Sequence, residues 1–347
     1  MRDSNSMATR KQAWLSGLVI ALAWWCESAF GQSLERFTFS EPHLGTIVEL
    51  TLYAPSETVA NEAARSGFAR IKELDLIFSD YKPDSEAMQL CALAGSGQAK
   101  RVSPELFQVL KQSLTISEQT GGAFDVTIGP LVQLWRKARK EKRLPTPEAI
   151  AEAKHLVDWK LIAVNEADQS VELKRAGMKL DFGGIAKGYI AQEVRRRLAE
   201  QGITRTLVAI SGDIVAGERP PMAEGWKVAI SPLTQDGRTR GRLLRLENQA
   251  VSTSGDRFQY VEIAGTRYSH VVDPRTGQAL TRRCSVTVVS NDAGFSDAAD
   301  TAIYVLGTEE GLKFIEKFSN AEALIVEAAA DRFETTETKG LRSLEER

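Results

Sequence analysis

The sequence is poor in the residues on which several classes of protein depend. It has only three histidines and three cysteines, and no cluster of the two that would form a zinc site. It has no basic excess, because 44 lysines and arginines face 46 aspartates and glutamates, so nucleic-acid binding is not expected. Beyond residue 40 no apolar run approaches the ~18 residues of a membrane span, and membrane association is not predicted. What remains is the composition of an ordinary globular protein, 43% hydrophobic over 347 residues.

The N-terminus has the three parts of an export signal. An apolar run covers residues 13–25, and small residues, Ala29 and Gly31, stand where a signal peptidase needs them. The positive residues that precede the run are Arg2, Arg10 and Lys11. This pattern predicts a signal peptide over residues 1–31, cleavage before Gln32, and an exported, periplasmic protein.

Two alternatives bear on the same segment. An uncleaved anchor helix is disfavoured because the run 13–25 is short for a membrane span. Lipidation of Cys26 is disfavoured because Trp25 precedes it where a small residue is needed. After cleavage only Cys91 and Cys284 remain, and they either form a disulfide or stay as two separate buried thiols.

The hydrophobic pattern predicts an α+β fold of mainly antiparallel sheets with packed helices. Apolar residues at helical spacing predict helices over 56–78, 103–120, 147–155, 185–201, 295–306 and 308–318. Strands are predicted over 36–39, 46–53, 206–210, 226–230, 249–253, 259–263, 285–289 and 324–328, with a hairpin over 161–173. Residues 137–146 are mostly charged and predict an exposed connection. Strands and helices do not alternate regularly, so one domain over 32–330 is expected, followed by a flexible tail over 331–347.

One segment combines a carboxylate, two glycines and a lysine. Asp181 ends a predicted strand, Gly183 and Gly184 follow, and Lys187 falls in the first turn of the next helix. Paired glycines let the backbone approach a ligand, and a helix N-terminus beside an ammonium favours phosphate oxygens. The alternative is a structural turn with a solvated lysine.

A second segment has the ligand types of a hard cation. Asp297 and Thr301 are four residues apart and share a helix face, with Asp300 beside them. Carboxylate and hydroxyl oxygens suit Mg²⁺, which keeps few protein ligands and completes its shell with phosphates and water. The alternative is a first helical turn whose acidic residues complement the helix dipole.

A third segment gathers His270, Asp273 and Arg275 at the end of a strand. A histidine there is suited to general-base work near neutral pH. The alternative is a histidine held by hydrogen bonds at a strand end, followed by a plain turn. His43 and His155 lie in no comparable cluster and are assigned no function.

Together these segments resemble the FAD:protein FMN transferase family, also called the ApbE family, over about residues 36–330. Eight pieces match in the family's order: 44–46, 81–86, 122–125, 181–188, 211–214, 253–256, 269–277 and 297–301. Among the departures, Leu44 stands where the family often has methionine, and Ser211 where it usually has glycine. The resemblance implies a single ApbE-like, T-fold-like domain.

The resemblance also implies roles for individual residues. Those that would bind FAD are Tyr81, Ala123, Phe124, Asp125, Asp181, Lys187 and Val272. Those that would hold Mg²⁺ are Gly184 through its carbonyl, Asp297 and Thr301, with Asp300 close by. His270 would be the catalytic residue.

The implied reaction cleaves the substrate FAD with the help of Mg²⁺, releases AMP, and attaches FMN through a phosphoester to a threonine or serine. The acceptor would be another protein, a respiratory or redox flavoprotein subunit. His270 or Asp273 would take the hydroxyl proton. Two alternatives remain: an FAD pyrophosphatase, which uses water in place of the acceptor, and a periplasmic FAD-binding protein without catalysis. FMN mass on an acceptor excludes the first, and AMP release excludes the second.

Overall fold

The computed structural model describes residues 33–230, 241–255, 259–329 and 332–346. Its centre is an eight-stranded sheet in the order β1-β2-β6-β7-β10-β13-β14-β15, in which every neighbouring pair is antiparallel. The strands are β1 (Glu35–His43), β2 (Thr46–Ala54), β6 (Thr206–Ile210), β7 (Asp213–Ala216), β10 (Ala250–Gly255), β13 (Cys284–Ser290), β14 (Glu322–Ala329) and β15 (Arg332–Glu337). The predicted α+β class with mainly antiparallel sheets is confirmed.

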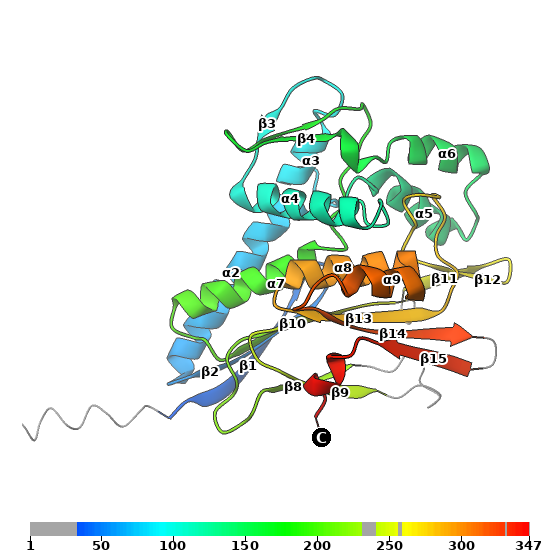
Figure 1. The fold of residues 1–347 in the computed structure, drawn as a ribbon. Coiled ribbons are helices and arrows are strands. Elements are labelled where there is room, and N and C mark those ends of the chain that lie inside the picture. The colour runs from blue at the N-terminus through cyan, green and yellow to red at the C-terminus, as the bar shows by residue number, and fades with distance from the viewer. Residues whose placement is uncertain (1–32, 231–240, 256–258, 330–331, 347) are drawn as a thin grey trace, which may run out of the picture.

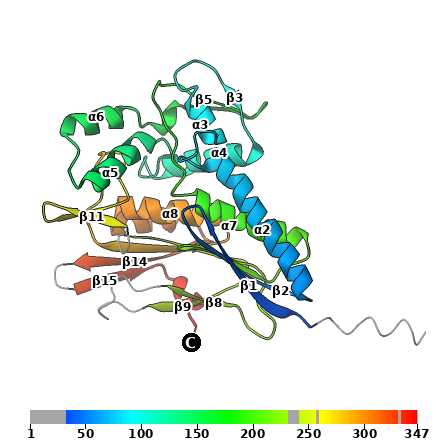
Figure 2. The same cartoon turned by 180° about the vertical axis from the view of Figure 1, so that it is seen from behind.

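Helices cover one face of this sheet (Figures 1 and 2). They are α2 (Glu57–Phe78), α7 (Ala186–Glu200), α8 (Ala293–Leu306) and α9 (Thr308–Ile315). Helix α2 begins where the Ser56 side chain accepts a hydrogen bond from the Val59 N–H. Its apolar residues recur every three or four positions, so Phe68, Ile71 and Leu74 are all buried. Each of these side chains contributes about 1.5–3 kcal/mol by leaving water.

A further layer lies beyond these helices, at the top of Figure 1. It consists of α3 (Glu86–Cys91), α4 (Pro104–Gln119), α5 (Gly129–Glu141), α6 (Pro147–His155), η2 (Trp159–Leu161), β3 (Lys100–Arg101), β4 (Ile162–Asn165) and β5 (Ser170–Leu173). The hairpin of β11 (Tyr260–Ile263) and β12 (Thr266–Ser269) projects to one side and leads into His270. On the far face of the sheet lie β8 (Trp226–Ile230), β9 (Arg242–Leu246) and η3 (Leu341–Leu344).

The sheet separates two apolar cores, because successive side chains of a strand point to opposite faces. On β13, Val286 and Val288 belong to the core under the helices. Val289 belongs to the second core, with Trp226 and Leu244 of the β8–β9 hairpin. Residues that share the helix-covered face of the sheet are therefore the ones that can meet α7 and α8.

Two expectations about local structure differ from what is observed. The charged stretch 137–146 is not wholly a connection, because α5 continues to Glu141 with Ala138 buried. The chain after Asp331 does not form a free tail over 332–346, since β15 pairs along β14 and Leu341 is fully buried in the second core. In both stretches a few apolar residues dock on the fold among many charged ones.

Cys91 and Cys284 do not form a disulfide with each other, and Cys91 accepts a hydrogen bond from the Leu180 N–H. The expected signal peptide, residues 1–31, lies outside the described residues. Within the described residues no helix combines the length and the apolar character needed to cross a bilayer.

Candidate active site

A cavity of about 1100 Å³ lies where the helical layers meet strand ends and turns of the central sheet. This is slightly above the ~300–1000 Å³ typical of ligand pockets, so the cavity has room for a dinucleotide. Eleven of the twelve predicted site residues line it: Tyr81, Ala123, Phe124, Asp125, Asp181, Gly184, Lys187, His270, Val272, Asp297 and Thr301. Asp300 does not line the cavity and is 1% exposed behind it.

The segment before α7 forms one end of the cavity as a tight turn. The Asp181 carboxylate accepts a hydrogen bond from the Gly183 N–H at 2.8 Å, which closes the turn. A Cβ at Gly184 would lie 3.2 Å from Thr301 Oγ1, so this backbone is held against α8. At Gly188 a Cβ would lie 2.0 Å from the Ala293 carbonyl oxygen, so only glycine lets α7 and α8 approach this closely. The glycines therefore bring the start of α7 onto the acidic face of α8.

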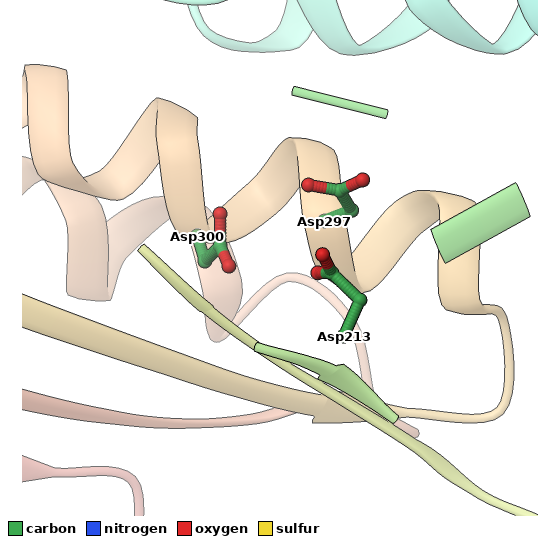
Figure 3. Close-up of side chains that lie close together, drawn as sticks. All are labelled: Asp213, Asp297 and Asp300. Atoms are coloured by element: carbon green, nitrogen blue, oxygen red, sulfur yellow. The ribbon is translucent and has the colours of Figure 1, made fainter. Parts of the chain in front are cut away.

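Three buried carboxylates meet at this contact, as Figure 3 shows. Asp297 and Asp300 come from α8, and Asp213 reaches toward them from the start of β7. One oxygen of each lies within 4.8 Å of the others. Burial and mutual repulsion raise the pKa of Asp297 and of Asp300 above their ordinary values. Helix-dipole complementation does not explain them, because Asp292 already caps α8 by accepting from the Phe295 N–H.

Lys187 provides the only cation in direct contact with this cluster among the described residues. Its ammonium contacts the Asp213 carboxylate and lies 3.6 Å from Asp297 Oδ1. Burial opposes its charge, but Asp213 and Asp297 outweigh burial and raise the pKa of Lys187. Three carboxylates and one ammonium leave a formal charge of −2 when all are ionised.

The donor set fits a hard divalent cation. Asp300 Oδ2 is buried and has no hydrogen-bond partner among the residues that the structure describes, whereas Asp300 Oδ1 accepts from Thr301 Oγ1 at 3.2 Å. Thr301 Oγ1 also lies 3.2 Å from Ser254 Oγ. An unsatisfied buried carboxylate oxygen is costly, and a cation bound by carboxylate and hydroxyl oxygens satisfies it.

Asp213 is the site residue that the sequence-based assignment missed. It follows Ser211 and Gly212, which form the two-residue turn between β6 and β7, and Ile210 pairs with it across that turn. Opposite residues of an antiparallel pair share a face, so Asp213 lies on the helix-covered face with Ile210. The family-like motif 211–214 was the available signal, but its spacing alone favours a plain turn.

His270 lies at the base of the β11–β12 hairpin. The backbone N–H of His270 donates to the Gln259 backbone carbonyl at 3.0 Å. The ring Nδ1 of His270 lies 3.2 Å from the same oxygen. A proton on Nδ1 fits this contact and leaves Nε2 as a proton acceptor. Burial, together with the positive charges of Arg139 and Lys187, lowers the pKa of His270 to about 4. The imidazole is therefore neutral at pH 7.

Asp273, the other candidate for the proton, is engaged elsewhere. Its two oxygens accept three hydrogen bonds from Arg275, at 2.9, 3.0 and 2.9 Å. It is also absent from the cavity lining. The geometry favours His270 as the base.

The other predicted residues form the walls. Asp181 is 3.2 Å from an Arg136 nitrogen, and the Arg136 guanidinium also contacts Asp80 and lies 4.4 Å from the centre of the exposed Tyr81 ring. Asp125 accepts from the Thr127 N–H and hydroxyl and from the Trp159 N–H.

Burial raises the pKa of Asp125 to about 6 despite these three hydrogen bonds. Asp125 thus anchors the loop that presents the buried Ala123 and Phe124 to the cavity. Val272 is buried beneath the turn, opposite Ala279.

Comparison with known proteins gives a consistent result. The model of the ApbE family matches residues 44–325. A protein of Treponema pallidum named FAD:protein FMN transferase is 29% identical, covering 90% of this chain and 91% of its own length. One of Klebsiella pneumoniae with the same name is 30% identical, covering 84% and 89%. The apo crystal structure of the Pseudomonas stutzeri flavinyl transferase ApbE superposes with a TM-score of 0.78 at 30% identity, covering 90% of this chain and 97% of that one.

Proposed function

The chain belongs to the ApbE family, and on that basis we propose that it is a Mg²⁺-dependent FAD:protein FMN transferase. It cleaves FAD between the two phosphates, releases AMP, and joins the FMN phosphate to a threonine or serine hydroxyl of an acceptor protein. The acceptor is a respiratory or redox flavoprotein subunit.

One observation carries this proposal: Asp297, Lys187 and His270 line the same cavity, and Asp297 belongs to a buried cluster of three carboxylates. Asp297 and Thr301, with the Gly184 carbonyl, would hold the Mg²⁺, and Asp300 and Asp213 would surround it with negative charge. When bound, Mg²⁺ supplies Lewis-acid neutralisation of the phosphate oxygens. A protein that only carried FAD would have no need of such a site.

The chain's own residues position and stabilise the diphosphate. The Lys187 ammonium sits in the first turn of α7, where the helix dipole also favours anions. On substrate binding its remaining N–H donors face the oxygens on which charge develops as AMP leaves. Asp213 holds this ammonium in place, so the lysine is oriented before the substrate arrives.

His270 takes the proton of the acceptor hydroxyl. The Gln259 carbonyl accepts from Nδ1–H, so Nε2 is the atom that receives the proton. The hydroxyl oxygen then bonds to the FMN phosphorus as the bond from that phosphorus to the AMP oxygen breaks. A pKa near 4 makes the free imidazole a weak base. The anionic diphosphate beside it raises that pKa and makes His270 a better acceptor when the site is filled.

The test is to incubate the purified protein with FAD and Mg²⁺, with and without candidate acceptor proteins, and to measure AMP and intact acceptor mass. We expect AMP release together with an acceptor that gains the mass of FMN. AMP without acceptor modification would instead identify an FAD pyrophosphatase, and no AMP would identify a binding protein.

We also propose that the protein acts after export. The support is the charged and apolar pattern of residues 1–31, with small residues before Gln32. N-terminal sequencing of protein recovered from the periplasm should begin at Gln32. An intact N-terminus on cytoplasmic protein would refute this.

A further inference from the structure

One wall of the cavity carries positively charged side chains, and the proposed function assigns no role to one of them, Arg139. The wall is α5 together with its N-cap residue Ile128, and the residues on its cavity side are Ile128, Val132, Arg136 and Arg139. Their spacing of four, four and three residues places them on one helix face. The adjacent face of the helix is buried in an apolar cluster through Leu131, Trp135 and Ala138. The helix is therefore held so that two guanidinium groups face the cavity.

The cationic side chains that line the cavity differ in whether a carboxylate is paired with them. Lys82 lies 2.6 Å from an Asp75 oxygen, Arg136 contacts Asp80 and Asp181, and Lys187 contacts Asp213. Arg139 forms no ion pair and no hydrogen bond within the described residues.

Arg139 is also partly buried in the wall. Burial and the positive charge of Arg136 both lower the pKa of Arg139. A partly buried cation beside a like charge is unfavourable unless an anion joins it. Because Arg139 lines the cavity, an anion bound in the cavity can supply this charge.

The surroundings that Arg139 shares with His270 indicate which anion of the substrate it binds. Arg139, Lys187 and His270 all line this cavity, and the positive charges of Arg139 and Lys187 both act on the His270 ring. A general base must lie within hydrogen-bond reach of the hydroxyl whose proton it takes. That hydroxyl attacks the phosphorus of the FMN half, which places this phosphorus near Arg139.

We propose that Arg139 binds the phosphoryl group of the FMN half, on the side away from Lys187 and the acidic cluster. The proposal rests on the proposed function, since that function places the phosphorus at His270. Arg139 donates N–H bonds to the non-bridging phosphoryl oxygens and exchanges no proton. As the bond to AMP breaks and the bond to the acceptor oxygen forms, these donors stabilise the charge on the transferred group. AMP leaves on the Lys187 side, while FMN stays bound at Arg139.

The experiment compares flavins that differ only in the phosphate. Binding of FMN and of riboflavin is measured by flavin fluorescence with Mg²⁺ present, for the wild type, Arg139→Gln and Arg139→Lys. Lys140→Gln is the matched control, because Lys140 neighbours Arg139 but is exposed on α5. The kcat of AMP release from FAD and the KM values for FAD and for the acceptor are measured on the same variants.

We expect Arg139→Gln to weaken FMN binding by roughly ten- to hundred-fold, as for a lost charged hydrogen bond, and to leave riboflavin binding unchanged. Its kcat should fall more than its KM rises, because the group acts on the transferring phosphate. Arg139→Lys should recover part of both losses, since lysine keeps the charge without the planar fork. Lys140→Gln should match the wild type.

Three results would overturn the proposal. Equal loss of FMN and riboflavin binding means that Arg139 only shapes the wall. Unchanged FMN binding with a raised KM for the acceptor means that Arg139 meets a carboxylate of the acceptor. Unchanged values throughout mean that the cavity does not place a phosphate there. Wild-type protein that releases no AMP from FAD would count against the proposed function, while the FMN comparison still decides whether Arg139 binds a flavin phosphate.

Discussion

Replacing Asp300 by asparagine should stabilise the metal-free protein while removing its response to Mg²⁺. Asp300 Oδ2 has no hydrogen-bond partner in the described part of the chain, and one Asp300 carboxylate oxygen lies within 4.8 Å of those of Asp213 and Asp297. At 4.8 Å and an effective dielectric constant of about 20, each like-charge pair costs about 3.5 kcal/mol. Lys187 offsets part of this. Asparagine removes the charge and keeps the shape, so we expect a gain of about 1–3 kcal/mol in EDTA.

The gain in unfolding free energy of Asp300→Asn over the wild type should increase as the pH rises. The pKa of Asp300 is raised in the folded state well above its ordinary value, so folding favours the protonated carboxyl. The wild type therefore holds the full contribution of this group below about pH 4 and loses it as pH rises through the folded-state pKa. Asparagine does not titrate, so the advantage of the variant should be small at pH 4.5 and larger at pH 8.

Magnesium should reverse the order of stability. A cation that binds only the folded state adds about 2.7 kcal/mol at a concentration of one hundred times its dissociation constant. The wild type should gain this, and Asp300→Asn should gain much less. The assay is urea unfolding at several pH values in EDTA and in Mg²⁺, with Asp168→Asn, in the exposed turn after β4, as the control. The reasoning is refuted if the variant is less stable in EDTA and both proteins respond equally to Mg²⁺.

The remaining predictions concern single residues of the site. Lys187→Met leaves the Asp213 carboxylate unpaired, so the unfolding free energy should fall by about 1–3 kcal/mol. The cost stays below that of a fully buried pair because the Lys187 side chain is 35% exposed. FAD binding should weaken as well. Unchanged FAD titrations would make it a purely structural residue. His270→Gln should abolish FMN transfer but retain FAD binding. Because the pKa of His270 is lowered to about 4, free-enzyme kcat/KM should be flat from pH 6 to 8 and fall only toward pH 4. A midpoint near 6.5 would contradict that assignment. Gly188→Ala forces a Cβ to 2.0 Å from the Ala293 oxygen and should lower stability by at least ~2 kcal/mol, whereas Gly67→Ala, which meets flexible Leu50 and Val194 side chains, should cost less. Thermal unfolding of the two variants tests this.

Much of the local structure follows from spacing in the sequence. The helix at 147–155 agrees with α6, and the predicted segments 56–78 and 103–120 each match a helix within one residue at each end. Their signals are strong because a capping Ser or Thr precedes an apolar periodicity. The face shared by Asp297 and Thr301 also follows directly, since four residues make about one helical turn.

The spacing of residues in the sequence does not predict which distant segments come into contact. Asp213 is 84 residues before Asp297 in the chain, and only the strand order of the sheet and the glycine contact between α7 and α8 bring them together. Arg139 lies in a stretch whose charge suggested an exposed connection. Its place in the wall depends on Trp135 and Ala138, which dock the adjacent face of α5. Pattern thus predicts elements, while packing decides which charged residues face a cavity.

The most direct test of the central claim is a crystal structure of the protein with FAD and Mn²⁺, which replaces Mg²⁺ and gives an anomalous signal. We expect one strong anomalous peak between Asp297, Thr301 and the Gly184 carbonyl, with the diphosphate bridging that peak and Lys187. A diphosphate bound elsewhere in the cavity, or a peak remote from Asp297, would contradict the account.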